Sequence, residues 1–122
     1  MGAVRAYNSN GLWLQEPEAV AEEAVVLRDE GSFHGLKLRL GRAHLADDLA
    51  TIDAGRQAVG EDMELMVDFN QGLDQAEALR RCHALDDLDL ALIEEPIFYD
   101  DIEGYRKLTA DLATPIQLGE NF

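Results

Sequence analysis

The segment Leu65-Met66-Val67-Asp68 is a short apolar run that ends in an acidic residue. The pattern recurs twice further along the chain, so that three such runs end in Asp68, Glu94 and Glu120. Successive acidic residues are 26 residues apart in both cases, from 68 to 94 and from 94 to 120. Because that length accommodates one strand, one helix and two loops, the repeat predicts successive parallel strands that each carry a carboxylate at the C-terminal end.

Three carboxylates at neighbouring strand ends form a candidate ligand site. The C-terminal edge of the sheet is where α/β folds bind their ligands. Mutual repulsion disfavours the charged forms of adjacent carboxylates, so a purely structural role for all three is difficult to explain. A divalent cation held by oxygen ligands removes that conflict. We therefore expect a metal site at Asp68, Glu94 and Glu120.

Apolar strand-like runs alternate with helix-like segments along the chain, which is the pattern of a parallel sheet flanked by helices. Pro17 suits the first turn of one such helix, and Gly31 suits the position after its end. The expected strands are residues 3–7, 35–40, 64–68, 91–94 and 115–118, and the expected helices are residues 17–30, 47–59, 74–85 and 101–112. No linker or low-complexity tract divides residues 1–122, so we expect one unit.

Strand parity indicates which side chains share a face with these carboxylates. Side chains alternate along a strand with a period of two, so the leucines of residues 36–40 should face the helices while Lys37 and Arg39 face the inner side of the sheet. The same parity puts further residues on the inner side, namely Met66, Asp68, Leu92, Glu94, Leu118 and Glu120. A buried ion-pair network is one interpretation of these charges. Their position at strand ends favours a functional site.

Composition excludes several classes of partner. Lys and Arg number 10 against 25 Asp and Glu, and the resulting net charge of −15 argues against binding to nucleic acid. The longest apolar stretches are too short to span a membrane, and the N-terminus has no basic segment that leads into an apolar one. Cys82 is the single cysteine, so no internal disulfide is available and a reducing, cytoplasmic location is expected.

Four motifs carry a resemblance to a known family. In order and spacing, the sequence resembles the mandelate racemase and muconate lactonizing enzyme family of the enolase superfamily, in its mandelate racemase-like branch. The motifs are Leu36-Lys37-Leu38-Arg39, Met66-Val67-Asp68-Phe69-Asn70-Gln71, Ile93-Glu94-Glu95-Pro96 and Gln117-Leu118-Gly119-Glu120-Asn121-Phe122. The resemblance covers essentially the whole chain. It implies an α/β fold that is part of a (β/α)₈ TIM barrel, with residues 1–122 supplying roughly the first five strands and four helices.

The resemblance also implies a chemistry. Asp68, Glu94 and Glu120 match the family's Mg²⁺ ligands, and Asn70 matches a polar position beside the metal. The implied reaction removes a proton next to the carboxylate of a small hydroxy acid through an enediolate, as in a racemase or a dehydratase. Three carboxylates, Mg²⁺ and a substrate carboxylate sum to a charge of −2, which Lys37 and Arg39 neutralise.

Arg39 departs from the family pattern, because it stands where a lysine usually acts as the base. A guanidinium stays protonated in proteins, so Arg39 suits a carboxylate clamp better than a base. The family's later strands and their His and Asp dyad lie outside this sequence, which leaves two function classes open. One is a fragment or half of a Mg²⁺-dependent mandelate racemase-like enzyme. The other is a non-catalytic metal-binding half-barrel or an assembly module.

The remaining candidate residues each have a functional and a structural interpretation. Glu95 supports the ligands from the opposite face, or forms an ion pair towards a helix. Tyr7 and Ser9 contact substrate, or cap the loop that follows their strand. His44 is expected to be an exposed loop residue, and Trp13 is expected to be a packing anchor.

An open sheet with five strands also predicts self-association. Its two edge strands would leave unpaired backbone groups, and an inner apolar face of Met66, Leu92 and Leu118 would meet water. We therefore expect a homo-oligomer.

Overall fold

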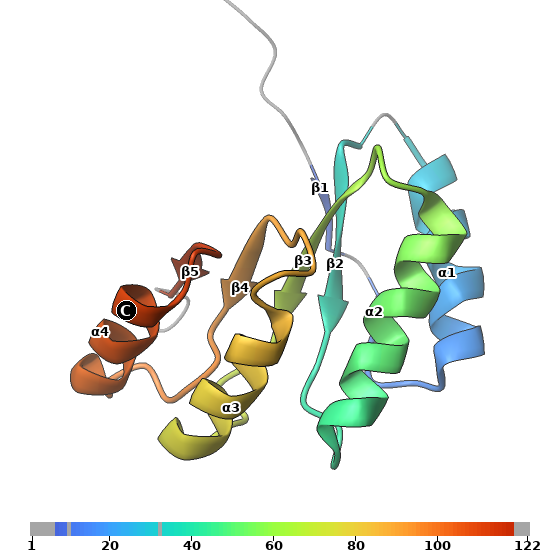
Figure 1. Cartoon of the computed structure of the whole chain (residues 1–122). Helices are drawn as coiled ribbons and strands as arrows, with labels where there is room; N and C mark the ends of the chain where they lie inside the picture. Colours follow the sequence, from blue (N-terminus) through green and yellow to red (C-terminus); the bar gives the residue numbers. More distant parts are fainter. Residues whose placement is uncertain (1–6, 10, 32, 119–122) are drawn as a thin grey trace, which may run out of the picture.

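The computed structural model describes residues 7–9, 11–31 and 33–118, and these form five parallel strands and four helices in alternation. The strands are β1 Tyr7–Asn8, β2 Gly35–Arg39, β3 Glu64–Asp68, β4 Leu92–Glu94 and β5 Ile116–Gln117, and the helices are α1 Pro17–Asp29, α2 Leu45–Val59, α3 Gln75–Leu85 and α4 Ile102–Asp111. The strands lie in the sheet in their chain order, with the helices packed against it (Figure 1). This order of neighbours is that of a barrel segment, which confirms the predicted fold class.

Capping residues explain most of the small differences from the predicted helix boundaries. Asp74 and Asp101 were expected to begin helices, but each is the N-cap, and its carboxylate accepts the backbone N–H of Glu77 or Gly104. Such a cap satisfies an N–H group that the helix itself leaves without a partner. Helix α2 begins two residues before the predicted Asp47, and α1 ends one residue before the predicted Glu30.

The first predicted strand, residues 3–7, can be compared only at Tyr7, since residues 3–6 lie outside the described part of the chain. The described strand β1 continues to Asn8, which is buried and donates from Nδ2 to the carbonyl of Leu27 at 3.3 Å. That bond ties the edge strand to the end of α1.

The core lies between the sheet and the helices. As predicted from strand parity, Leu36 and Leu38 are fully buried on the helix side, together with Leu65, Val67 and Ile93 of the next strands. The helices contribute Val20, Ala24, Ile52, Ala78, Cys82, Leu85, Tyr105 and Leu108 to the same cluster. One face of the sheet therefore supplies the packing that holds the other face in place.

Sheet register confirms the parity prediction for the charged residues of β2, β3 and β4. Lys37 pairs with Met66, and Arg39 pairs with Asp68. Asp68 in turn pairs with Glu94. Paired residues of parallel strands point to the same side, so these charges share the inner face at the C-terminal ends of the strands.

The parity prediction is wrong for Leu118. Glu94 pairs with Gln117, and Ile93 pairs with Ile116, so Ile116 and Leu118 share the helix side. Leu118 lines a groove with Ile102 and other residues of α4, and it packs against the core. The apolar inner face that was expected to meet water therefore lacks Leu118. It is reduced further because Met66 is only 3% exposed.

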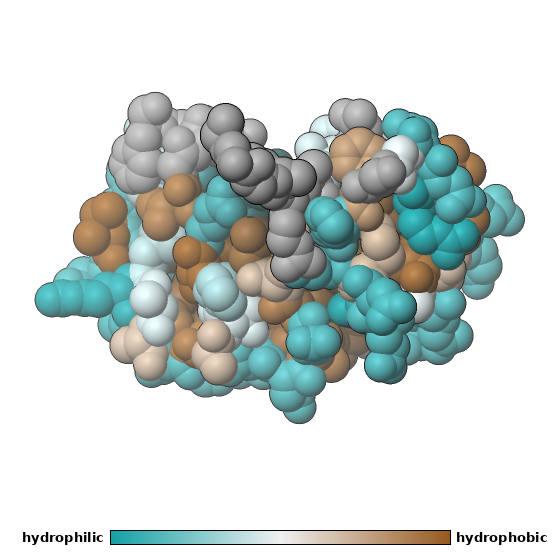
Figure 2. Space-filling view, turned by 90° about the horizontal axis from the view of Figure 1, so that it is seen from above, coloured by the Kyte–Doolittle hydropathy of each residue, from teal (hydrophilic) through white to brown (hydrophobic). Residues whose placement is uncertain are grey.

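The surface at the N-terminal ends of the strands carries both apolar and polar residues. Seen from above, apolar residues are scattered among polar residues that dominate the rim (Figure 2). Across the described residues, no helix combines the length and the apolar composition needed to cross a membrane.

Candidate metal and substrate site

Four charged side chains lie together on the inner face of β2, β3 and β4. Lys37, Arg39 and Glu94 are each 8% exposed, and Asp68 is 2% exposed. Burial of a charge is costly unless the charge is paired and hydrogen-bonded. Two cations and two carboxylates at adjacent register positions meet that requirement.

Lys37 bridges the two carboxylates. Its Nζ donates to Oε2 of Glu94 at 2.7 Å and lies 3.6 Å from Oδ2 of Asp68. The same Nζ lies 5.9 Å from the centre of the Tyr7 ring, at the outer limit of a cation–π contact. Tyr7 thus lies beside a site residue, on the edge strand β1.

Arg39 is held from three directions. Its Nη2 donates to the carbonyl of Ser9 at 3.1 Å, and its Nη1 lies 3.6 Å from Oδ2 of Asp68. The ring of Trp13 covers the guanidinium, with 4.9 Å between Cζ and the ring centre. Trp13 is 60% exposed, so the prediction that it is a packing anchor is wrong. Ser9 reaches the site through its backbone carbonyl.

Asn70 orients the Asp68 carboxylate. Its backbone N–H donates to Oδ1 at 2.8 Å, and its Nδ2 donates to Oδ2 at 3.3 Å. Asn70 and Gln71 both have positive φ, of 50° and 62°, which turns the chain sharply after β3. Asparagine tolerates this left-handed region better than most residues, so the local sequence suits the turn that Asp68 needs.

Two of the three expected metal ligands are therefore adjacent, while Glu120 lies outside the described residues. Within residues 7–9, 11–31 and 33–118, no group of three or more His, Cys, Asp and Glu residues is placed to hold a metal. Mg²⁺ is commonly bound through one or two carboxylates together with waters and substrate oxygens. The Asp68 and Glu94 pair fits that cation, because both are hard oxygen donors and each has an oxygen within 3.6 Å of the same cationic group, Lys37 Nζ.

Glu95 points away from this cluster, as predicted. Its side chain is fully buried, and its φ of 47° marks the turn after β4. Burial raises the pKa of the Tyr105 hydroxyl, and the negative charge of Glu95 raises it further. Tyr105 Oη donates to the carbonyl of Ile97 at 2.7 Å. Glu95 therefore lies near Tyr105 of α4, on the helix side of the sheet.

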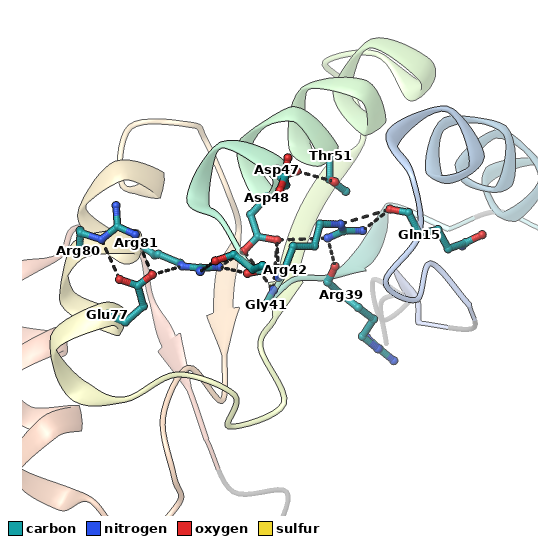
Figure 3. Close-up of polar contacts among 11 residues, drawn as sticks. Gln15, Arg39, Gly41, Arg42, Asp47, Asp48, Thr51, Glu77, Arg80 and Arg81 are labelled. Atoms are coloured by element: carbon teal, nitrogen blue, oxygen red, sulfur yellow. Dashed lines mark hydrogen bonds and ion pairs between the residues drawn. The ribbon is translucent and has the colours of Figure 1, made fainter.

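A second charged network, centred on Asp48, was not predicted from the sequence (Figure 3). Asp48 is fully buried and accepts from the backbone N–H groups of Gly41 and Arg42 at 3.1 Å each. It also accepts from Nη1 of Arg81 at 2.7 Å. The sequence signal for this network is the acidic pair Asp47-Asp48 in the first turn of a helix. Such pairs are common, and they predict only a favourable interaction with the helix dipole.

Arg81 and Arg42 connect this network to the site. Arg81 donates to the carbonyl of Arg42 at 2.8 Å, and also to Glu77, whose pKa is lowered to about 2 by hydrogen bonds from Arg80 and Arg81. Arg42 donates to the carbonyl of Arg39 at 3.0 Å and to the carbonyl of Gln15 at 3.0 Å. The network thus fixes the loops after β1 and β2, between which Arg39 lies (Figure 3).

His44 is exposed at the N-cap of α2, as predicted, and its side chain makes no capping hydrogen bond to that helix.

The fold and this cluster together define the class of protein. It is a parallel α/β protein of the barrel type, with carboxylates and cations gathered at the C-terminal edge of its sheet. Comparison with known proteins gives the family. The chain belongs to the family described as enolase C-terminal domain-like, which matches residues 19–122.

Relatives in this family are enzymes of several reaction types. The chain is 38% identical to the L-talarate/galactarate dehydratase of Salmonella typhimurium over 118 residues, which are 97% of this chain and 30% of that protein. Other relatives are named as epimerases and racemases. The chain therefore spans about a third of the length of the proteins that it matches.

Solved structures agree closely with the fold. An enolase from alpha proteobacterium bal199, solved with bound magnesium, superimposes with a TM-score of 0.95 at 57% identity, over 99% of this chain and 34% of that one. An enolase from Bradyrhizobium, solved with magnesium and mandelic acid, gives a TM-score of 0.87 at 37% identity, over 98% and 32% of the two chains.

Proposed function

We propose that this chain forms the metal-binding part of a Mg²⁺-dependent enzyme of the mandelate racemase type. The substrate is a small hydroxy acid, and the reaction begins with removal of the proton next to its carboxylate. The observation that carries the proposal is the pairing of Asp68 with Glu94 across adjacent strands, with Lys37 bridging them. Relatives that are dehydratases, epimerases and racemases support it.

Asp68 and Glu94 would hold the metal, with Glu120 as the third ligand expected from the sequence. Bound Mg²⁺ would supply positive charge beside the substrate carboxylate as the proton leaves. Asn70 fixes the Asp68 carboxylate through two hydrogen bonds, so this oxygen pair faces the site in one orientation. Such support of a ligand by its neighbours raises metal affinity.

Lys37 and Arg39 bind the anionic substrate in this proposal. Both cations lie on the inner face beside the carboxylates, and the buried Nε and Nη1 atoms of Arg39 have no hydrogen-bond partner among the described residues, although Nη1 lies 3.6 Å from Oδ2 of Asp68. Hydrogen bonds from such donors to a carboxylate are charge-assisted and strong. Tyr7 and the Ser9 backbone border the same cations from β1.

The second candidate function is metal and acid binding without catalysis. The ion pairs of Lys37 and the permanent charge of Arg39 favour this second candidate. Lys37 is engaged with both carboxylates, and Arg39 cannot release a proton to act as a base. In that case the chain is a metal-binding half-barrel or an assembly module.

Calorimetric titration of mandelate into the chain, with Mg²⁺ or with a chelator, tests the proposal. We expect heat of binding only when Mg²⁺ is present, and we expect Asp68→Asn to abolish it. Asp87→Asn is the matched control, because Asp87 is exposed in the turn that precedes β4, at the other end of that strand. Binding that is equal in chelator, or unchanged in Asp68→Asn, would contradict the proposal.

A further inference from the structure

Trp13 is the only tryptophan in the chain, and it is 60% exposed beside the site. The backbone around it is well anchored. Leu12 is 1% exposed, donates its N–H to the carboxylate of Glu23 on α1, and accepts the backbone N–H of Arg39 at 3.1 Å.

The anchor at Leu12 fixes Trp13 relative to Arg39. One residue beyond that backbone bond, the Trp13 ring lies 4.9 Å from the Arg39 Cζ. Gly11 makes the turn with a φ of 84°, and a Cβ there would meet the Glu23 carboxylate. The exposure of Trp13 is therefore a consequence of how the loop is held.

The ring also accounts for the burial of Arg39. The arginine is 8% exposed although two of its nitrogens, Nε and Nη1, have no hydrogen-bond partner among the described residues. Asp68 and the Ser9 carbonyl hold the guanidinium at its edge, whereas Trp13 covers a face. A cation–π contact at this distance restrains the plane of the group and uses none of its N–H donors.

We propose that Trp13 is a positioning residue, which holds the plane of the Arg39 guanidinium in the orientation in which it binds a substrate carboxylate. The identity of the anion rests on the proposed function. Restraining the arginine before binding lowers the entropy that is lost when the carboxylate binds. Trp13 should therefore strengthen binding of a carboxylate ligand and leave Mg²⁺ binding unchanged.

The test compares Trp13→Leu, which keeps an apolar side chain, with Trp13→Phe, which keeps an aromatic face. Leu14→Ala is the matched control, because Leu14 is the next residue and is 56% exposed. Calorimetry measures the Kd of mandelate at saturating Mg²⁺, and NMR follows the Nε–H resonance of Arg39. Mandelamide, which lacks the negative charge, serves as the control ligand.

We expect Trp13→Leu to weaken mandelate binding about 2- to 30-fold, the range that corresponds to a cation–π contact. Trp13→Phe should recover part of the loss, Leu14→Ala should bind as the parent does, and affinity for mandelamide should not change. The Arg39 Nε–H resonance should shift in Trp13→Leu, by more than in Trp13→Phe, and should stay at the parent position in Leu14→Ala. Equal binding by the parent and Trp13→Leu would overturn the positioning role alone. A parent that binds Mg²⁺ but no mandelate would overturn the proposed function and this inference together.

Discussion

Lys37 and Arg39 determine whether the site contains a group that can accept a proton from the substrate. Lys37 Nζ is 2.7 Å from Glu94 and 3.6 Å from Asp68, and an ammonium has no lone pair with which to accept a proton. Arg39 stays protonated at any pH of interest. A positioned base contributes about 10²- to 10⁴-fold to proton abstraction, so its absence has a large effect.

We therefore predict that this 122-residue chain exchanges the α-proton of 2-hydroxy acids far more slowly than an enzyme with a positioned base, even with Mg²⁺ bound. The measurement is proton–deuterium exchange by NMR on a panel of 2-hydroxy acids, with Lys37→Ala as the control. Fast exchange in the parent that disappears in Lys37→Ala would contradict the prediction and make Lys37 the base.

At the scale of elements, Asp48 joins α2 to the loop after β2 and, through Arg81, to α3. All of its hydrogen-bond donors are backbone N–H groups or arginines, and its side chain is fully buried. We predict that Asp48→Asn lowers the free energy of unfolding by about 3–5 kcal/mol, because it removes the buried carboxylate that pairs with Arg81 and leaves this buried guanidinium with the partly exposed Glu77 as its counter-charge.

Urea denaturation measures this loss, with Asp47→Asn as the matched control. Asp47 precedes Asp48 in the same helix turn but is exposed, so its replacement should cost no more than about 1 kcal/mol. Equal effects of the two substitutions would show that burial of the Asp48 charge contributes nothing to stability.

Asp86 connects the end of α3 to the loop before β5. Its carboxylate accepts the backbone N–H of Thr114 at 2.8 Å, that of Ala113 at 3.1 Å, and the Thr114 hydroxyl at 2.8 Å. These hydrogen bonds hold the pKa of the Asp86 carboxyl below its usual value of 3.8. Because the folded pKa is the lower one, the contribution to stability is complete above about pH 4 and declines as the pH falls through the folded pKa.

We predict that Asp86→Asn is less stable than the parent at pH 7 and that the difference narrows below pH 4. Urea denaturation at a series of pH values measures it, with Asp87→Asn as the exposed neighbour for comparison. If the free energies of unfolding of Asp86→Asn and the parent differed by the same amount from pH 7 to below pH 4, protonation of Asp86 would not be linked to stability, and the prediction would be wrong.

Short-range chemistry explains which elements could be predicted from sequence. Period-two alternation in residues 36–40 and the repeated acidic strand ends placed Lys37, Arg39, Asp68 and Glu94 on one face, as the register confirms. The position of Leu118 was predicted wrongly, since the register of β5 depends on how Ile116 packs against the core rather than on the spacing of acidic residues.

Contacts between distant segments could not be predicted. The bond from Arg81 to Asp48 joins residues 33 positions apart and depends on how α3 packs beside α2, which no local pattern predicts. The stacking of Trp13 on Arg39 is similar, because it depends on the backbone bond between Leu12 and β2.

For the whole molecule, the predicted self-association now rests on a different surface. Met66 is buried and Leu118 faces α4, so the exposed apolar residues nearest the edge strand β5 include Ile102, which is 62% exposed. We predict that the chain self-associates through this edge, where β5 is the last strand of the sheet among the described residues. Light scattering at micromolar concentration measures the mass. Ile102→Glu should reduce association, whereas Val26→Glu on α1, 61% exposed, should not. A parent that is a monomer throughout would contradict the prediction.

The central claim is that Asp68 and Glu94 hold Mg²⁺, and metal binding to the folded chain must then stabilise it. A ligand at 100 times its Kd adds about 2.7 kcal/mol to the free energy of unfolding. In a chain of this size each kcal/mol raises Tm by roughly 4 °C.

The most direct measurement is therefore the Tm of the parent and of Asp68→Asn, each in millimolar Mg²⁺ and in chelator. We predict that Mg²⁺ raises the Tm of the parent by several degrees and leaves that of Asp68→Asn unchanged. The same Tm for the parent in Mg²⁺ and in chelator, or an equal rise in both proteins, would contradict it.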